Sequence, residues 1–290
     1  MKKVSIVTNF KTPEKASTAR AAAEIFISCG AEVLMPVYAR ESEEIAALQA
    51  GAQLRFVPNR ELYEGPDILA VVGGDGSILE AVRNSAGSGV PILGINRGRL
   101  GYMAELELSE LPLIGEISAG RYTVEKRSMI DVGVESAGRR VSTFTALNDA
   151  VVTNGSISRI IDLQLYEGDE LVGTYRADGL IVSTPTGSTA YSLSAGGPIL
   201  DPQLSAVCVT PVCAHSFAAR PMVFPDSTVL RIVNVSTREP NVWLTVDGRT
   251  NVRIGRNDAV VITKSGSSAS FIRVKKNRFY RLLAEKLESV

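Results

Sequence analysis

The stretch from Gly73 to Ser77, Gly-Gly-Asp-Gly-Ser, places one acidic side chain among glycines directly after the apolar run from Ile68 to Val72. Glycines let backbone N–H groups approach a phosphate closely, and a helix that begins at such a turn adds the positive end of its dipole. A carboxylate there repels phosphate unless it has a task, such as accepting the proton of an attacking hydroxyl or helping to hold a metal ion. The stretch therefore indicates phosphoryl transfer, or else an ordinary tight turn that Asp75 caps.

The segment from Asp178 to Pro198 passes from an apolar run into a stretch dense in hydroxyl-bearing and small residues, and it ends in Gly-Gly-Pro. Small residues permit close approach of a ligand, hydroxyl and N–H groups supply hydrogen bonds, and Tyr191 offers a flat apolar face. This composition suits a sugar and a purine, and we expect the stretch to lie outside the core. The alternative is a flexible loop rich in serine and threonine. The fixed positions of glycine and proline around the segment disfavour that alternative.

A third polar feature is the pair Asn148-Asp149, which follows the strand-like run from Ser142 to Ala146. A carboxamide beside a carboxylate can hold the vicinal hydroxyls of a ribose. Two residues of this kind are also a common turn, and the pair by itself favours the turn.

Several common catalytic motifs are absent from the chain. It has no GxxxxGK[ST], no GxGxxG and no GxSxG, so a P-loop, a dinucleotide fingerprint and a serine-hydrolase elbow lack support. His215 is the only histidine, which excludes a multi-histidine metal site and weakens any mechanism based on a histidine. We therefore predict no tightly bound protein metal.

These residues need elements to position them, and the first 121 residues alternate β-rich runs with helical patterns. Thr12-Pro13 predicts a helix start, and the alanine-rich pattern that follows ends near Gly30. Ser77 and Glu80 have capping-box spacing, which predicts another helix start. The predicted strands are Val4 to Val7, Glu32 to Val37, Gln53 to Val57, Ile68 to Val72 and Ile92 to Ile95. This alternation predicts a Rossmann-like α/β domain, residues 1–121, with a mainly parallel sheet.

Beyond residue 121 short β-branched or alternating runs dominate. They are Ser128 to Val134, Val141 to Thr145, Ile160 to Tyr166, Leu171 to Thr174, Leu180 to Ser183, Val229 to Val235, Val242 to Val246, Ala259 to Thr263 and Ser270 to Val274. A hairpin turn is expected at Glu167-Gly168-Asp169. The pattern predicts an all-β domain over residues 122–270. From Asn277, apolar residues at helical spacing predict a closing helix within residues 271–290.

Composition limits the class of partner. Lys plus Arg and Asp plus Glu both total 31, so the whole chain has no general attraction to nucleic acid or to an anionic membrane. The cysteines Cys29, Cys208 and Cys213 are odd in number and lack CxxC spacing, which is typical of a reducing cytosol. No apolar run approaches the length of a membrane helix, and we expect a cytoplasmic protein.

Together these segments resemble the NAD kinase family. The resemblance rests on Gly73 to Ser77 with Leu79, Leu93 to Gly98 leading to Leu100 to Tyr102, Asn148-Asp149 and the segment from Asp178 to Pro198. The motifs occur in the family order from about residue 67 to about residue 249. The resemblance implies an α/β domain followed by a sandwich-like β domain, NAD bound in the cleft between them, and a tail that often returns to the first domain. It also implies transfer of phosphate from Mg²⁺-bound ATP to the adenosine ribose 2′-hydroxyl of NAD, in a homodimer or homotetramer.

The resemblance further assigns roles to residues. Asp75 would accept the proton, and the phosphate-binding residues would be Gly73, Gly74, Gly76 and Ser77. The NAD-binding residues would be Asp75, Gly76, Asn148, Asp149, Arg159, Arg176, Asp178, Thr186, Thr189, Ala190, Tyr191, Ser192, Leu193, Ser194 and Arg249. Ser77 stands where threonine is commoner, Arg99 where a small polar residue is more usual, and Arg249 where glutamine is frequent.

Two other functions share part of this pattern. Lipid kinases of the diacylglycerol type also have a GGDG loop, but they would need an apolar acyl groove that the hydroxyl-rich segment disfavours. A dinucleotide sensor without catalysis would have no need of Asp75 at a phosphate turn.

Overall fold

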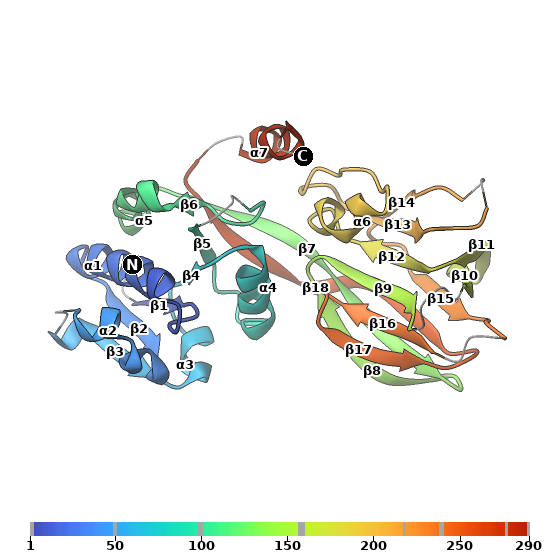
Figure 1. The fold of residues 1–290 in the computed structure, drawn as a ribbon, viewed down its shortest axis with the longest axis horizontal. Coiled ribbons are helices and arrows are strands. Elements are labelled where there is room, and N and C mark those ends of the chain that lie inside the picture. Colours follow the sequence, from blue (N-terminus) through green and yellow to red (C-terminus); the bar gives the residue numbers. More distant parts are fainter. Residues whose placement is uncertain are drawn as a thin grey trace. The chain divides into compact units, whose positions relative to one another are not determined.

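The computed structural model describes residues 3–48, 51–97, 101–155, 160–216, 219–237, 241–275 and 278–288. It consists of two compact units, which are shown in Figure 1. Unit 1 comprises Met1–Lys126 and Ala269–Val290, and unit 2 comprises Arg127–Ser268. The predicted combination of an α/β part with an all-β sandwich is confirmed.

The centre of unit 1 is a parallel sheet. Its strands are β1 (Lys3–Val7), β2 (Glu32–Pro36), β3 (Leu54–Val57), β4 (Ile68–Val72) and β5 (Ile92–Asn96), in the order β3-β2-β1-β4-β5. The short strand β6 (Leu106–Glu107) pairs with β5, and so does the C-terminal end of β18. Every residue of β4 and β5 is buried, because both faces of the sheet are covered.

The helices of unit 1 connect and cover these strands. They are α1 (Pro13–Ser28), α2 (Glu43–Ala46), α3 (Asn59–Tyr63), α4 (Asp75–Asn84), α5 (Ile114–Ser118) and α7 (Arg278–Glu288), with 3₁₀ turns at Val37–Glu41, Gly51–Gln53 and Leu108–Leu113. As predicted, α1 has proline in its first turn and stops before Gly30, whose φ of 83° ends the helix. In α7, Leu282 is buried whereas Tyr280 is exposed.

Unit 2 is a sandwich of antiparallel strands. One sheet has the order β14-β13-β12-β9-β16-β17, and the other strands are β7, β8, β10, β11, β15 and β18. The bounds are β7 (Thr123–Ser136), β8 (Arg139–Ala146), β9 (Asp149–Asn154), β10 (Ile161–Glu167), β11 (Glu170–Ala177), β12 (Gly179–Ser183), β13 (Ala206–Val212), β14 (Met222–Pro225), β15 (Leu230–Asn234), β16 (Val242–Val246), β17 (Thr250–Ile254) and β18 (Ala259–Arg273). Alternate residues of facing strands, such as Leu163 and Leu165 with Leu180 and Val182, form one core.

Some strand predictions need correction. The two strands predicted between Ala259 and Val274 are one continuous strand, β18. Its polar middle is mostly exposed and stays extended instead of forming a turn. The strands β6, β9, β13, β14 and β17 were not predicted. The predicted hairpin is confirmed, because β10 and β11 are joined at Gly168, which has a φ of 56°.

Candidate active site

The Gly-Gly-Asp-Gly turn closes the buried strand β4. The N–H of Gly73 donates to the carbonyl of Ile95 (2.9 Å), and a Cβ at position 73 would lie 2.5 Å from the Ser77 hydroxyl oxygen. Gly74 is the N-cap of α4, and its carbonyl accepts from the N–H groups of Ser77 (2.9 Å) and Ile78 (3.2 Å). The positive end of the α4 dipole therefore lies at this turn, beside the exposed backbone of Gly74.

The predicted capping box of Ser77 and Glu80 is wrong. The helix α4 begins at Asp75 with Gly74 rather than Ser77 as its N-cap, three residues earlier than the box implies, and no side chain caps it. A glycine at the N-cap provides the required backbone conformation without a side-chain oxygen. Ser77 instead lies inside the first turn, where it packs against Gly73.

The Asp75 carboxylate does not cap its own helix but binds a neighbouring loop. Its oxygens accept hydrogen bonds from the backbone N–H groups of Tyr102 (3.0 Å) and Met103 (3.1 Å). A Cβ at Gly101 would lie 2.0 Å from the Asp75 Oδ1 atom, so only glycine fits there. These contacts fix the plane of a half-buried carboxylate that stands at a helix N-terminus.

The ring of Tyr102 is flanked by side chains of α7. The Phe279 ring lies 6.3 Å away between centroids, and the Lys286 ammonium lies 4.2 Å from the Tyr102 ring centre. Burial raises the pKa of the Tyr102 hydroxyl, and the charge of Asp75 adds to the shift. The C-terminal helix is thus part of the surroundings of Asp75 within unit 1.

In unit 2 the Asn148-Asp149 pair is held by a carboxylate that sequence reasoning missed. Asp247 accepts from the N–H groups of Leu147 (2.9 Å), Asn148 (2.8 Å) and Asp149 (3.1 Å), and its own N–H donates to the Asp149 carbonyl (3.0 Å). The signal in the sequence is the Asp-Gly turn after a strand; Asp247 has a φ of 47°, which is unusual for a residue with a side chain. The pair is not a free turn, because Asp149 is the first residue of β9.

Asp149 is buried, with 5% of its surface exposed. Burial, followed by the charge of Asp247, raises the pKa of the Asp149 carboxyl from 3.8 to about 7. Its protonation state therefore changes near neutral pH, which is unusual for an aspartate and is common at functional sites.

The hydroxyl-rich segment lies largely inside unit 2, so the expectation that it stays outside the core is wrong. Its buried hydroxyl residues are Ser183, Thr184, Thr186, Ser188 and Ser192. Most of these hydroxyls form hydrogen bonds within the fold. The Thr184 hydroxyl donates to the Leu147 carbonyl (2.5 Å), and the Ser188 hydroxyl donates to the Pro185 carbonyl (2.7 Å). The Ser192 hydroxyl is hydrogen-bonded to the Thr210 hydroxyl (2.9 Å). Burial of polar groups is tolerated when they are hydrogen-bonded in this way.

The remaining predicted site residues differ in exposure. Tyr191, Ser194, Arg176 and Arg249 are exposed, Asp178, Thr189, Ala190 and Leu193 are half-buried, and Gly73 is buried while Gly76 is exposed. Arg159 and Arg99 lie outside the described residues. A 3₁₀ turn at Gly187–Thr189 and the short helix α6 (Tyr191–Ser194) carry the segment after β12.

The structure gathers some of these residues and separates others. Thr184 donates through its N–H to the Asn148 carbonyl (2.9 Å), so the hydroxyl-rich segment, Asn148 and Asp247 adjoin one another. Asp178 and Arg176 are not part of this group. Gly179 pairs with Thr153 whereas Ser183 pairs with Asp149. Asp178 therefore lies five residues along the strand direction from the position opposite Asp149, a separation of roughly 17 Å.

Gly187→Ala should destabilise unit 2. A Cβ at position 187 would lie 2.1 Å from the carbonyl oxygen and 2.5 Å from the carbonyl carbon of Asn148, and backbone cannot move aside as a side chain can. We expect a loss of about 1–3 kcal/mol or more in the free energy of unfolding, with a lower melting temperature in a thermal scan. Gly266→Ala is the control, because a Cβ there meets nothing within 4 Å. Equal melting temperatures for both variants would contradict the prediction.

Among the described residues there is no group of three or more His, Cys, Asp or Glu side chains arranged to hold a metal ion. Within the same part of the chain, no helix has the length and apolar character needed to cross a membrane.

Comparison with known proteins gives matches along most of the chain. Residues 4–116 match the family model of the ATP-NAD kinase N-terminal domain, and residues 147–274 match that of the ATP-NAD kinase C-terminal domain. A curated relative from Carboxydothermus hydrogenoformans, named NAD kinase, is 46% identical over 228 residues, which are 78% of this chain and 81% of the relative. The NAD kinase of Moorella thermoacetica is 40% identical over 289 residues, covering 99% and 90% of the two chains.

Solved structures give the same result for the fold. The crystal structure of yeast NADH kinase complexed with NADH has a TM-score of 0.90 at 25% identity, over 99% of this chain and 88% of that one. An NAD kinase from Archaeoglobus fulgidus, in complex with ATP, has a TM-score of 0.71 at 23% identity, over 100% of both chains.

Proposed function

The chain belongs to the NAD kinase family, and from this premise we propose that it transfers the γ-phosphoryl group of ATP to the adenosine ribose 2′-hydroxyl of NAD, giving NADP. The observation that carries the proposal for this chain's own residues is the position of Asp75. A carboxylate fixed by two backbone N–H groups stands where a strand ends and the N-terminus of α4 begins. That arrangement offers a proton acceptor beside an environment that favours phosphate.

Asp75 is the proposed proton acceptor. Phosphoryl transfer asks mainly for positioning of the reactants and stabilisation of charge, so one oriented carboxylate and backbone donors suffice as the protein's part. The 2′-oxygen attacks the γ-phosphorus in line, the bond from the γ-phosphorus to the bridging oxygen breaks to release ADP, and Asp75 removes the proton of the 2′-hydroxyl late. The exposed backbone at Gly74 and Gly76 and the dipole of α4 support a phosphate-binding role for this turn. Mg²⁺ enters as part of the substrate, Mg-ATP.

Unit 2 supplies the proposed contacts to NAD. The Asn148 side chain and the Asp149 carboxylate are proposed to bind a ribose, which is supported by the rigid hold of Asp247 on their backbone. The exposed face of Tyr191 is proposed to stack on a base. Ser192 stays among the proposed NAD-binding residues. The hydroxyls of Ser188 and Ser192 also hold the segment in place through bonds within the fold.

Turnover of defined substrates tests the proposal. The protein, incubated with Mg-ATP and NAD, is expected to form NADP, measured with an NADP-specific dehydrogenase. Diacylglycerol in place of NAD should accept no phosphate from radiolabelled ATP. Binding of NAD without NADP formation would instead support a sensor, and phosphorylation of the lipid would support a lipid kinase.

Three finer properties are also proposed. Mg²⁺ is the proposed divalent ion for ATP, the protein is proposed to form a homodimer or homotetramer, and it is proposed to work in the cytoplasm. The absence of disulfides among the cysteines Cys29, Cys208 and Cys213 supports a reducing compartment.

A further inference from the structure

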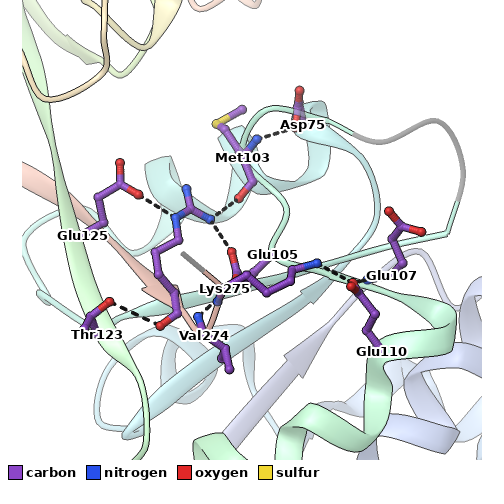
Figure 2. A network of polar contacts seen from close by, with 10 residues as sticks. Asp75, Met103, Glu105, Glu107, Glu110, Thr123, Glu125, Val274 and Lys275 are labelled. Carbon is purple, nitrogen blue, oxygen red and sulfur yellow. Dashed lines mark hydrogen bonds and ion pairs between the residues drawn. The ribbon is translucent and has the colours of Figure 1, made fainter. Parts of the chain in front are cut away.

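The loop that fixes Asp75 is itself held from its other side. Met103 donates through its N–H to the Asp75 carboxylate (3.1 Å), and its carbonyl accepts a hydrogen bond from the Arg273 Nη1 group (3.1 Å). Arg273 is the last residue of β18, far along the chain from the loop. Met103 thus links the Asp75 carboxylate to the Arg273 guanidinium. Figure 2 shows the hydrogen bond between Met103 and Asp75 and the bond to the Met103 carbonyl.

Two carboxylates hold the guanidinium in a fixed orientation. Its Nε donates to Glu125 (2.6 Å), and its Nη1 also lies 3.3 Å from Glu105. The Arg273 side chain is only 12% exposed, and that of Glu105 is fully buried. A guanidinium presents its donors in a rigid planar fork, so bonds in two directions leave it little freedom to rotate.

Glu105 also ties the chain after β18 to the same place. It accepts from the backbone N–H groups of Val274 (2.9 Å) and Lys275 (2.8 Å), which Figure 2 shows beside the loop. Replacing a whole buried ion pair by apolar residues of the same size is often neutral for stability, whereas removing one partner alone is strongly destabilising. The network reaches the loop beside Asp75 through one hydrogen bond, from the Arg273 Nη1 group to the Met103 carbonyl.

We propose that Arg273 is a positioning residue for phosphoryl transfer, which orients the Asp75 carboxylate through the backbone of Met103. The inference rests on the proposed function, in which Asp75 accepts the proton. Displacement of a catalytic group by about 1 Å can cost 10²-fold in rate. Arg273 acts on the rate of the chemical step and has no part in holding NAD or ATP.

Arg273→Met removes the donor to Met103 and is expected to lower kcat about 10- to 100-fold. KM for NAD and for ATP should change less than about twofold, because the variant disturbs only the transition state. Arg273→Lys keeps a positive charge near Glu105 but cannot bond in two directions as the fork does, so it should recover part of kcat. If Arg273→Met does not fold, Arg273→Lys carries the same comparison with a smaller expected loss.

A double-mutant cycle separates positioning from general weakening. In the Asp75→Asn background, either change at Arg273 should alter the residual rate less than about twofold, because residues that act through one another are non-additive. Lys275→Met is the matched control: it breaks the ion pair with Glu110 in the same segment without a side-chain contact to Met103, and kcat should not change.

The outcomes are distinct. Three results would overturn the positioning role and leave the kinase assignment standing. They are a loss of kcat on substitution of Arg273 that persists in the Asp75→Asn background, an unchanged kcat for Arg273→Met, and an effect of Arg273→Met on KM instead of kcat. A near-normal rate for Asp75→Asn itself would overturn the role of Asp75, and with it both proposals for this loop. Absence of NADP formation by the unaltered protein would contradict the function itself.

Discussion

Asp75→Asn should lower the turnover of NAD by about 10²- to 10⁴-fold, the range expected for loss of a general base. The amide cannot take up the proton of the 2′-hydroxyl at neutral pH. One bond to the loop is also lost, because an amide has a single acceptor oxygen and its NH₂ group would face the N–H of either Tyr102 or Met103. NAD affinity should be largely kept, since the proposed ribose and base contacts lie in unit 2.

The measurement is kcat from NADP formation, together with a Kd for NAD from calorimetry. Glu80→Gln is the control, because it removes an exposed carboxylate from the same helix, α4. Its turnover should equal that of the unaltered protein. If Asp75→Asn retains turnover within about threefold, Asp75 is not the base; if NAD binding falls as steeply as turnover, Asp75 holds the substrate instead.

Asp149→Asn should make the fold more stable, and more so at pH 8 than at pH 5. The pKa of the Asp149 carboxyl is about 7 in the folded protein against 3.8 as its ordinary value. Between these values the folded state keeps a proton that the unfolded state has released, so stability falls as pH rises from about 4 to 7, and above 7 the full penalty remains. A neutral amide removes the penalty, which gives a pH-dependent gain of about 3 kcal/mol between pH 5 and pH 8.

Urea unfolding at the two pH values measures this effect. Trp243, the only tryptophan of the chain, lies on β16 beside β9 and reports on unit 2 by its fluorescence. Asp169→Asn, at the exposed hairpin turn between β10 and β11, is the control for loss of a carboxylate at the surface and should show no comparable difference. An Asp149→Asn gain that is the same at both pH values would contradict a protonated Asp149 in the folded protein.

Much of the fold could be predicted from local pattern. The continuous apolar run of β4 is typical of a parallel strand covered on both faces, and alternation in β10 and β16 is typical of a sandwich. The wrong strand predictions concern segments whose conformation depends on the strands with which they pair. The polar middle of β18 has the composition of a turn, and the pairing of the strand with β15, β5 and β7 keeps it extended.

Burial of hydroxyls is the clearest case in which composition misled. Thr184, Ser188 and Ser192 have the side chains of a solvent-exposed loop, yet each finds a partner inside unit 2. A hydroxyl bonded to a backbone carbonyl or to another hydroxyl can be buried at little cost. Sequence shows that such a group can form hydrogen bonds, but it does not show with which atom.

The sequence by itself determined the chemistry that the chain can perform: a glycine turn with one carboxylate after a buried strand, an Asn-Asp pair, and the family to which these motifs belong. Only the tertiary structure decided which residues control them. Asp247 holds Asn148 and Asp149, and Arg273 reaches Asp75 through Met103, in each case across a long stretch of chain. Hydrogen bonds between distant residues depend on the path of the folded backbone, and no local pattern of residue types specifies that path.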